Sequence, residues 1–408
     1  MMLNFLKKDP VLEMEDYDFT ALKKVLNTPI EDVIADIKKA DLKGRGGAGF
    51  PAGVKWELAC KETASEKYVV CNADEGEPGT FKDRYLLENS PWQVLEGILI
   101  SAYVIGAEQG YIYIRGEYVT PIKIFNKVIE KAEKNGLLGK NILGEEFNFE
   151  LKLIKGAGAY ICGDETSLLN SIEGNRPRSR IKPPYPIQSG LYGQPTLVNN
   201  VETLAAAVEV INQGVDNYIA LGTAESNGTK LISLSGEVNE PGVYEIEFGS
   251  VTIREIVEKL GKGIRNNGQL KFVVPGGVST AILPKEKLDI PYSYEDIKAA
   301  GSNTGSGAMI VVSEENNLID LMLNVAEFFM SETCGTCFPC REGIRQVCYL
   351  LKNAKERGCL NERDFELITD LSETTYLAAR CGLGQTSLSF VTSILNEYRT
   401  ELLQGGEQ

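Results

Sequence analysis

The sequence predicts a parallel α/β domain, then a small β-grasp-like domain, and then a C-terminal bundle of four helices. Three observations predict this order. Strand and helix patterns alternate up to about residue 212, which is typical of a parallel sheet. Short elements in ββαβ order occupy residues 229–281, and from residue 316 onward the apolar positions repeat with a helical period. The expected boundaries are 1–27 for an N-terminal arm, 28–226 for the α/β domain, 227–314 for the β-grasp-like domain and 315–408 for the bundle.

The helices and strands follow from apolar runs and their spacing. In the α/β domain we expect helices at 30–43, 56–61, 92–107, 121–135, 166–173 and 197–212, with strands at 67–71, 111–115 and 149–154. In the next domain we expect strands at 231–235, 243–246, 272–274 and 308–312, and a helix at 252–260. The bundle helices are expected at 317–333, 341–356, 361–378 and 385–402. The arm before residue 28 is polar and of mixed charge, with little periodicity.

Composition limits what the chain can do. Its 408 residues are 43% hydrophobic and 24% charged, which is typical of a globular protein with two or three domains. The net charge of −15 argues against nucleic acid as a partner, because phosphate binding needs a basic face. The absence of histidine excludes triads, metal sites and general bases that depend on histidine. The chemistry must therefore come from a cofactor, a carboxylate or a thiolate.

The sequence also indicates a compartment. No apolar run reaches the roughly 18 residues of a membrane span, and the first residues lack the apolar segment of a signal peptide. We therefore expect a cytoplasmic protein, free or peripheral to a membrane complex, without direct membrane insertion. Nine cysteines in that compartment favour metal ligands or buried thiols over disulfides.

A glycine-rich loop at residues 44–56 is the first candidate binding site. Five glycines in ten residues let the backbone approach a ligand, while Arg45 and Lys55 can add charge-assisted bonds to phosphate. A flexible linker is the alternative, but Phe50 and Trp56 are unusual in a linker. The spelling G-x-G-x-x-G matches a dinucleotide fingerprint, yet a helix rather than a strand precedes it, and the Walker pattern is absent. The loop is thus predicted to bind phosphate in a third way.

Carboxylates gather after the first predicted strand and at a later helix start. Asp74, Glu75 and Glu77 follow the strand directly, where open α/β sheets bind ligands, although an acidic surface turn fits the same residues. Asp164 and Glu165 open a helix, where a capping role is the alternative to a binding role. Tyr160, just before them, is an aromatic residue suited to a ring ligand.

Two further segments can bind anions. Residues 175–186 form a proline-rich, extended arm with four basic residues, which bind either phosphates or the protein's own carboxylates. Asn199 and Asn200 precede a helix, whose first N–H groups form an anion site with an Asn as N-cap.

The cysteines predict an iron–sulfur cluster. Cys334, Cys337 and Cys340 have the C-x2-C-x2-C spacing of a [4Fe–4S] site, which needs a fourth thiolate. Zinc is the alternative, but zinc sites normally pair two separate C-x2-C hooks and the chain has one. Among the later cysteines, Cys381 lies in a glycine-lined connection that can fold onto a cluster and is our choice. Cys348 and Cys359 remain alternatives, and Cys60, Cys71 and Cys162 are expected to be buried or structural thiols.

Seven motifs together resemble one family. They are GRGGAGFPAGVKW (44–56), NADEGEPGT (72–80), YICG (160–163), KPPYP (182–186), VNNVET (198–203), CGTCFPCREG (334–343) and the late Cys381. In this order they resemble the FMN- and NADH-binding flavoprotein subunit of respiratory complex I, a family shared with NAD-linked soluble or bifurcating hydrogenases and formate dehydrogenases. The resemblance covers about residues 30–400. It implies a Rossmann-like FMN domain, a β-grasp-like domain and a helical bundle that holds the cluster.

The resemblance also implies site residues. The FMN phosphate is expected on Gly44, Arg45, Gly46, Asn199 and Asn200, with Lys55, Asn72, Asp74, Glu75, Tyr160 and Thr203 around the flavin. NADH is expected to stack on the flavin against Phe50, with Glu77, Lys182 and Tyr185 as further contacts. Other cofactor contacts are expected from Gly47, Gly163, Asp164, Glu165 and Val198. Catalytic roles are expected for Glu77, Tyr160 and Glu165, and cluster ligation for Cys334, Cys337, Cys340 and Cys381.

One departure stands out, because the family usually has two glutamates after the YICG motif and this chain has Asp164 first, which alters the reach of that side chain. Longer hydrogenase relatives add two further iron–sulfur domains, and we expect neither here.

The function that the resemblance implies is hydride transfer from NADH to FMN, then single-electron transfer through the cluster to partners. These partners are expected to be a thioredoxin-like [2Fe–2S] subunit and a larger iron–sulfur or catalytic subunit of the hydrogenase, formate dehydrogenase or complex I type. Electron bifurcation and a scaffold with degenerate sites are the alternatives.

Overall fold

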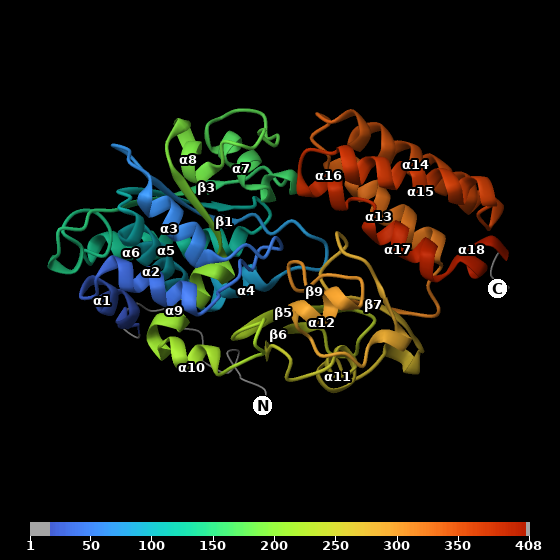
Figure 1. Cartoon of the computed structure of the whole chain (residues 1–408), viewed down its shortest axis with the longest axis horizontal. Helices are drawn as coiled ribbons and strands as arrows, with labels where there is room; N and C mark the ends of the chain where they lie inside the picture. Colours follow the sequence, from blue (N-terminus) through green and yellow to red (C-terminus); the bar gives the residue numbers. More distant parts are fainter. Residues whose placement is uncertain (1–16, 405–408) are drawn as a thin grey trace. The chain divides into compact units, whose positions relative to one another are not determined.

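The computed structural model describes residues 17–404, which divide into two compact units (Figure 1). The first unit contains residues up to 76, 80–232 and 243–250, and the second contains 77–79, 233–242 and 251 onward. Most of the predicted N-terminal arm lies outside the described residues. Its last part forms helix α1 (Thr20–Leu26), whose Ala21, Leu22 and Val25 are buried.

The first unit is built on a parallel sheet of order β3-β2-β1-β4. Its strands are β1 (Tyr68–Ala73), β2 (Gln109–Ile114), β3 (Glu150–Lys155) and β4 (Thr196–Asn200). Side chains alternate across the sheet: Val69 and Cys71 join a large core, whereas Tyr68 and Val70 join a smaller one with Leu168 and Leu169 of α7. Both faces are therefore covered, as parallel sheets require.

The ends of helix α5 (Pro91–Ile105) show how the local sequence sets where a helix of this unit begins and ends. The helices of the unit are α2 (Ile30–Lys39), α3 (Ala52–Lys61), α4 (Lys82–Asn89), α5 (Pro91–Ile105), α6 (Val119–Lys134), α7 (Glu165–Ile172), α8 (Pro186–Ser189), α9 (Val201–Gln213) and α10 (Val215–Ile219). Helix α5 starts with Pro91 at its first turn and ends at Gly106, whose φ of 72° suits a left-handed C-cap. At Gly97 a Cβ would lie 2.4 Å from the carbonyl oxygen of Leu204, so this glycine lets α5 and α9 pack backbone to backbone.

The expected elements of this unit are present, with ends shifted by a few residues, except at residues 197–200, and α4, α8 and α10 were not expected. Residues 197–200 were expected to begin a helix, but they belong to β4, which pairs with β1 before α9 starts at Val201. The five residues of β4 (TLVNN) include only two apolar side chains and lead directly into a helix, so the sequence shows no strand pattern there, and pairing with β1 makes them a strand. Helix α4 was not expected, because its eight residues have little apolar periodicity.

The second sheet has the order β6-β5-β9-β7-β8, and the division between the units falls inside β5 and after the first residue of β6. Its strands are β5 (Thr229–Gly236), β6 (Gly242–Glu247), β7 (Leu270–Val274), β8 (Leu283–Pro284) and β9 (Ala308–Ser313), with helices α11 (Ile253–Glu255), continued by a π-helical turn to Leu260, and α12 (Tyr294–Ala299). The expected ββαβ order is present. The short β8 and α12 were not expected, since neither is long enough to show a period.

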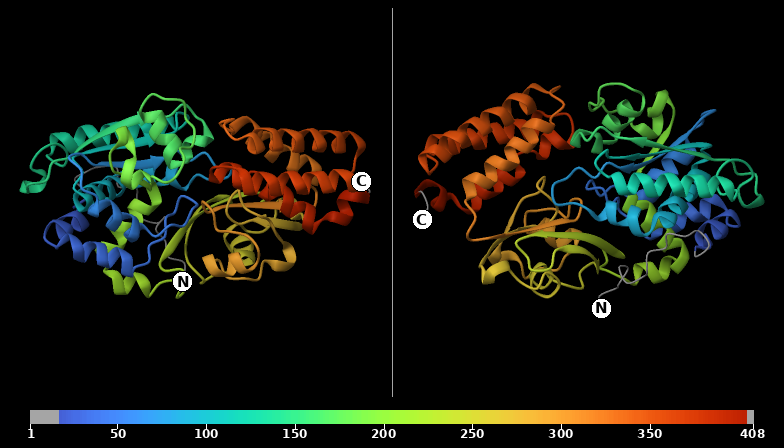
Figure 2. Two further views of the ribbon diagram at one scale, coloured as in Figure 1. Left: turned by 45° about the horizontal axis from the view of Figure 1, so that its top comes forward. Right: turned by 180° about the vertical axis from the view of Figure 1, so that it is seen from behind.

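The C-terminal helices lie side by side in all three ribbon views (Figures 1 and 2). They are α13 (Leu318–Glu332), α14 (Phe338–Arg357), α15 (Glu362–Ala378), α16 (Gly382–Thr386), α17 (Ser389–Glu397) and α18 (Arg399–Gln404). The first three match the expected helices, whereas the expected fourth is broken into α16, α17 and α18. The first break follows Ser387, whose buried hydroxyl donates to the carbonyl oxygen of Gly384 and so competes with helical pairing. Among the described helices, none is long and apolar enough to cross a membrane.

Candidate functional site

The ends of two neighbouring strands and the glycine loop meet at one edge of the first sheet. Because β1 and β4 are parallel, Asn72 pairs in register with Asn200, and both strands end there. A Cβ at Gly46 would lie 3.2 Å from Cβ of Asn200, so the loop backbone packs on the end of β4. The sheet thus brings residues 44–47, 72–76 and 198–203 to the edge where open parallel sheets bind ligands.

The loop itself is a folded turn rather than a linker. The Gly44 N–H donates to the Phe50 carbonyl oxygen at 2.9 Å, and the Ala52 N–H donates to that of Leu42 at 2.8 Å. Gly47 has a φ of 120°, a conformation that favours glycine. Backbone without side chains, held in this way beside two strand ends and a helix N-terminus, fits the phosphate of FMN.

Arg45 lies inside the unit rather than on the loop's surface. Only 1% of it is exposed, and its guanidinium donates to the Tyr218 hydroxyl at 3.1 Å and stacks 4.9 Å from the ring centroid of Phe248. Its backbone N–H donates to the Thr203 hydroxyl at 2.9 Å. The sequence suggested a guanidinium that binds phosphate, whereas in the structure this side chain fixes the loop to the core.

Lys55, Glu165 and Lys182 form a chain of charges. The ammonium groups of Lys55 and Lys182 donate to opposite oxygens of Glu165 at 2.9 and 2.8 Å, and Lys55 also donates to the Val198 carbonyl oxygen at 2.8 Å. Burial alone would raise the pKa of Glu165, but the two lysines hold that pKa at about 2. The trio therefore carries one net positive charge at neutral pH, joining α3, α7 and β4.

Asn72, Tyr160, Gly163 and Asn199 also lie at this edge. The Asn72 amide donates to the Gly163 carbonyl oxygen at 2.9 Å, and the Trp56 indole donates to Asn199 at 2.9 Å. A Cβ at Gly76 would lie 3.0 Å from the ring of Tyr160, so that ring covers the backbone just after Asp74 and Glu75. Phe50 is 52% exposed and Tyr185 is 51% exposed, which leaves both rings free to meet a ligand.

Asp164 is the N-cap of α7. Its carboxylate accepts from the Ser167 N–H at 3.0 Å and from the Thr166 hydroxyl at 2.6 Å. The structure therefore shows the capping role that was one of the two alternatives for Asp164. In this role the carboxylate binds the first turn of α7.

We expect Asp164→Ala to destabilise the apoprotein by about 1 kcal/mol, the usual cost of a lost N-cap. Asp164→Asn should be nearly neutral because asparagine caps equally well. The measurement is the thermal unfolding midpoint of each variant without cofactor. Equal midpoints for the alanine variant and the unaltered chain would contradict the capping role.

Glu75 and Glu77 accept hydrogen bonds from backbone N–H groups of different segments. The Glu75 carboxylate accepts from the N–H groups of Asp83 and Arg84 at 2.8 and 2.9 Å, so it caps α4. Burial, with Asp83 nearby, raises the pKa of Glu75 to about 7. Glu77 belongs to the second unit, where it accepts from the Ser279 N–H at 2.8 Å. Glu75 and Glu77 thus have separate surroundings.

The cysteines of the candidate cluster lie at one end of the C-terminal helices. Cys337 is the N-cap of α14 and Cys340 lies in its first turn, where it is 6% exposed and 3.1 Å from the Thr333 hydroxyl. Cys381 is the N-cap of α16, and a Cβ at Gly384 in that helix would lie 3.3 Å from Sγ of Cys340. Burial, together with the nearby Cys337 and Cys334, raises the pKa of Cys340. A bound iron ion would act in the opposite direction, because its positive charge favours the thiolate.

The other cysteines lie elsewhere. Cys348 is buried within α14, and Cys71 and Cys162 are buried in the first unit. Within residues 17–404, no three Cys, Asp or Glu side chains come close enough to hold a single metal ion. A [4Fe–4S] cluster differs from such a site, because each of its four irons takes one thiolate and the thiolates need not meet.

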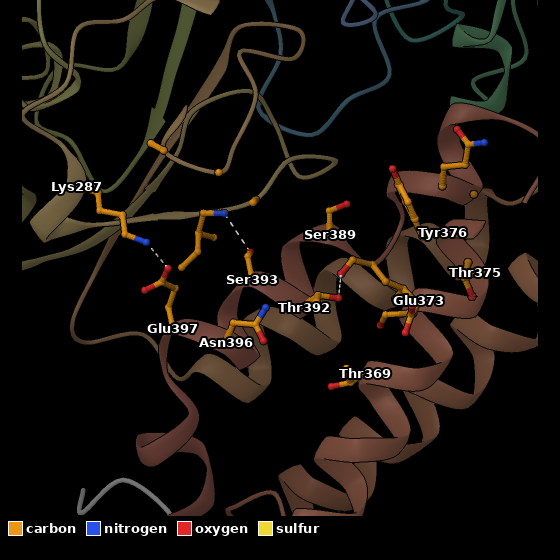
Figure 3. A pocket seen from close by; sticks show the side chains of 18 residues that line it. Lys287, Thr369, Glu373, Thr375, Tyr376, Ser389, Thr392, Ser393, Asn396 and Glu397 are labelled. Atoms are coloured by element: carbon orange, nitrogen blue, oxygen red, sulfur yellow. Dashed lines mark hydrogen bonds and ion pairs between the residues drawn. The ribbon is translucent and has the colours of Figure 1, made fainter. Parts of the chain in front are cut away.

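A cavity of about 440 Å³ lies between the β domain and the C-terminal helices of the second unit (Figure 3). Hydroxyl and amide side chains make up half of its lining residues, and Lys287 pairs with Glu397 at 2.6 Å on its wall. None of the cysteines lines it. This cavity could not be predicted from the sequence, because its walls come from two separate segments, 281–301 and 369–397.

A group of buried charges near the glycine loop was also missed. Lys82, Asp83, Glu202 and Lys230 are each 5% exposed or less. Their sequence positions lie in three separate segments, so no motif joins them. The signal that could have been used is the position of Glu202 in the first turn of α9, next to Asn200.

Comparison with known proteins agrees with this architecture. Residues 37–209 match the model of the Nuo51 FMN-binding domain, 230–297 an SLBB domain, and 320–405 the NADH-ubiquinone oxidoreductase-F iron–sulfur binding region. An NADH-quinone oxidoreductase subunit of Rhizobium meliloti is 42% identical over 94% of this chain and 91% of its own length. The NADP-reducing hydrogenase subunit HndC of Solidesulfovibrio fructosivorans is 41% identical over 97% of this chain and 80% of its own length.

A solved structure shows the same fold. The crystal structure of an NAD+-reducing [NiFe]-hydrogenase in the H2-reduced state superposes with a TM-score of 0.86 at 32% identity, and the match covers 98% of this chain and 67% of that chain.

Fold, loop and cysteines together define a flavin- and iron–sulfur-dependent oxidoreductase subunit that uses NADH. The chain belongs to the family of the FMN-binding, 51 kDa-type subunit of NADH-quinone oxidoreductase, which NAD-reducing hydrogenases share. Membership confirms the predicted family, the order of an α/β FMN domain, a β domain and a helical cluster region, and the cofactors FMN and [4Fe–4S]. The β-grasp-like part corresponds to the SLBB domain. The individual site residues and the exact domain boundaries remain predictions.

Proposed function

We propose that this chain takes electrons from NADH at the edge formed by β1, β4 and the glycine loop, and passes them to a cluster held by Cys334, Cys337, Cys340 and Cys381. The observation that carries the proposal is the meeting of bare loop backbone, two strand ends and the N-terminus of α9 at one edge. When bound there, FMN accepts a hydride from NADH and the cluster carries single electrons onward.

The Lys55–Glu165–Lys182 trio orients the cofactors in this proposal. Its net positive charge favours the negatively charged groups of FMN and NADH, and the hydrogen bonds to Glu165 keep both ammonium groups in place. Tyr160 closes one side of the edge over Gly76. Hydride transfer between stacked rings depends on such positioning more than on proton donors, which agrees with the absence of histidine.

The partners follow from the relatives. Similar chains are named as subunits of NADH-quinone oxidoreductase and of a hydrogenase, so we infer that this chain works in a complex of one of these kinds. Its expected neighbours are a thioredoxin-like [2Fe–2S] subunit and a larger iron–sulfur or catalytic subunit, in the cytoplasm or at a membrane complex. The similarity to HndC keeps electron bifurcation as the second candidate function. Identifying the subunits that copurify with the chain separates the two functions.

Purification under anaerobic conditions tests the proposed function. The chain is expected to contain one FMN and about four irons, and NADH is expected to bleach the flavin absorbance. A preparation that binds neither flavin nor iron after reconstitution would refute the proposal.

Phe50→Ala is expected to raise the KM for NADH about tenfold while FMN content stays the same, because base–aromatic stacking contributes about 1–3 kcal/mol. The measurement is steady-state reduction of ferricyanide by NADH. Tyr349→Ala is the matched control, since this ring on α14 is also exposed but lies in the second unit. An unchanged KM in the Phe50 variant would exclude its stacking role.

A further inference from the structure

Four charged side chains are buried together behind the glycine loop. Lys82 pairs with Asp83 at 2.6 Å and with Glu202 at 3.0 Å, and Lys230 pairs with the same oxygen of Glu202 at 2.6 Å. All four groups belong to the first unit and are 5% exposed or less. Buried charges of this kind are costly, and they are seldom needed for stability alone. Their presence therefore calls for a functional explanation.

This buried charge network is joined to the loop at Asn200. The Asn200 amide donates to Asp83 at 2.6 Å, and Lys82 donates to the Asn200 side-chain oxygen at 3.4 Å. The other side of Asn200 packs against Gly46 of the loop. The network thus fixes the orientation of a side chain that lies at the end of β4 and caps α9.

The network contains both signs of charge. Lys82, Lys230 and the neighbouring Arg45 are basic, whereas Asp83, Glu202 and the buried Glu75 are acidic, and these groups act on one another. Among the basic groups, Lys82 donates to Asn200, whose other side packs on the loop. Water does not screen the positive charge of Lys82 well, because this residue is only 1% exposed.

We propose that the buried charge network of Lys82, Asp83, Glu202 and Lys230 positions Asn200 and supplies positive charge to the FMN phosphate, which makes the site select FMN over riboflavin. The inference rests on the proposed function, because it takes the phosphate to lie at the glycine loop. The lysines do not touch FMN in this proposal. They are positioning residues that act through Asn200 and through their field.

The charges around Lys230 affect its pKa. Burial, with Lys82 and Arg45 nearby, lowers the pKa of Lys230 to about 7, although Glu202 opposes the shift. A dianionic phosphate at the loop would oppose this positive field and favour the charged form of Lys230. Binding of FMN is thus expected to stabilise the network as well as the loop.

The test compares FMN with riboflavin, which lacks the phosphate. Dissociation constants of both for the apoprotein are measured by quenching of flavin fluorescence. Near pH 6, below the pKa of Lys230, we expect Lys230→Met to bind FMN about tenfold more weakly, the size of effect that one unit charge has at an effective dielectric constant of about 20. Riboflavin should bind as before. Lys82→Met, a second variant that also loosens Asn200, should weaken FMN binding by at least as much.

Two controls make the result specific. Lys39→Met removes an exposed charge of the same unit and should change neither constant. Lys230→Arg keeps the charge and should restore at least part of the preference for FMN.

Equal weakening of FMN and riboflavin in both methionine variants would overturn the inference, because a purely structural role affects the whole flavin. An unchanged FMN constant would overturn it too. If the unaltered chain binds both flavins equally, the proposed placement of the phosphate itself fails, which this comparison separates from a failure of the network.

Discussion

Replacing Cys381 by serine is expected to abolish the [4Fe–4S] cluster while leaving FMN bound. The reason is that three thiolates at 334–340 satisfy three irons, and the fourth iron needs a ligand that the bundle can bring to them. Helix α16 brings Cys381 to the cysteine end of α14, since Gly384 packs on Cys340. Reduction of FMN by NADH occurs in the other unit and should continue, whereas electron transfer beyond the flavin should stop.

The measurement is iron content and the electron paramagnetic resonance signal of the reduced protein, with flavin content from the same sample. Cys348→Ser is the matched control, because Cys348 is a buried thiol within α14 whose pKa burial raises to about 11. It should keep about four irons. If the Cys381 variant kept its iron, or if the Cys348 variant lost its iron, Cys381 would not be the fourth ligand.

The large elements of the fold were predictable because each has a local cause. Helix α5 is apolar over four turns and starts with a proline. Strands β1 and β2 are short and mostly apolar, β3 alternates charged with apolar side chains at its start, and helices separate the three. The cluster motif was predictable for another reason, since ligand spacing within nine residues is a local property of the sequence. The family resemblance then joined motifs that no local pattern connects.

What could not be predicted depends on contacts between distant segments. Strand β4 exists because β1 lies beside it, and helical spacing misled the assignment of residues 197–200. The acidic motif at 72–80 looked like one group of ligands, but Glu75 caps α4 and Glu77 binds the backbone at Ser279 in the second unit. The partners of a charged side chain depend on the folded structure and cannot be read from the sequence. For this reason the buried charge network was also missed.

The glycines of the loop have different structural roles, and these roles could not be distinguished from the sequence alone. Gly47 permits a positive φ, and Gly46 leaves space next to Asn200. Gly53 is different, because it lies in the first turn of α3 and packs against α2. A Cβ there would lie 2.6 Å from the backbone nitrogen of Lys38. The closeness of these two helices sets where the loop between them lies.

Gly53→Ala is accordingly expected to cause the opposite loss from Cys381→Ser: FMN binding should weaken more than tenfold, and the cluster should remain. Alanine would favour the helix by about 1 kcal/mol, but overpacking against a backbone that cannot rotate away costs about 1–3 kcal/mol or more. The clash therefore wins, α3 moves away from α2, and the loop that begins at Gly44 shifts relative to Asn200. Gly382→Ala is the control, since a Cβ there meets nothing within 4 Å and should leave FMN binding unchanged. Stoichiometric, tightly bound FMN in the Gly53 variant would show that the spacing of α2 and α3 does not set the cofactor site.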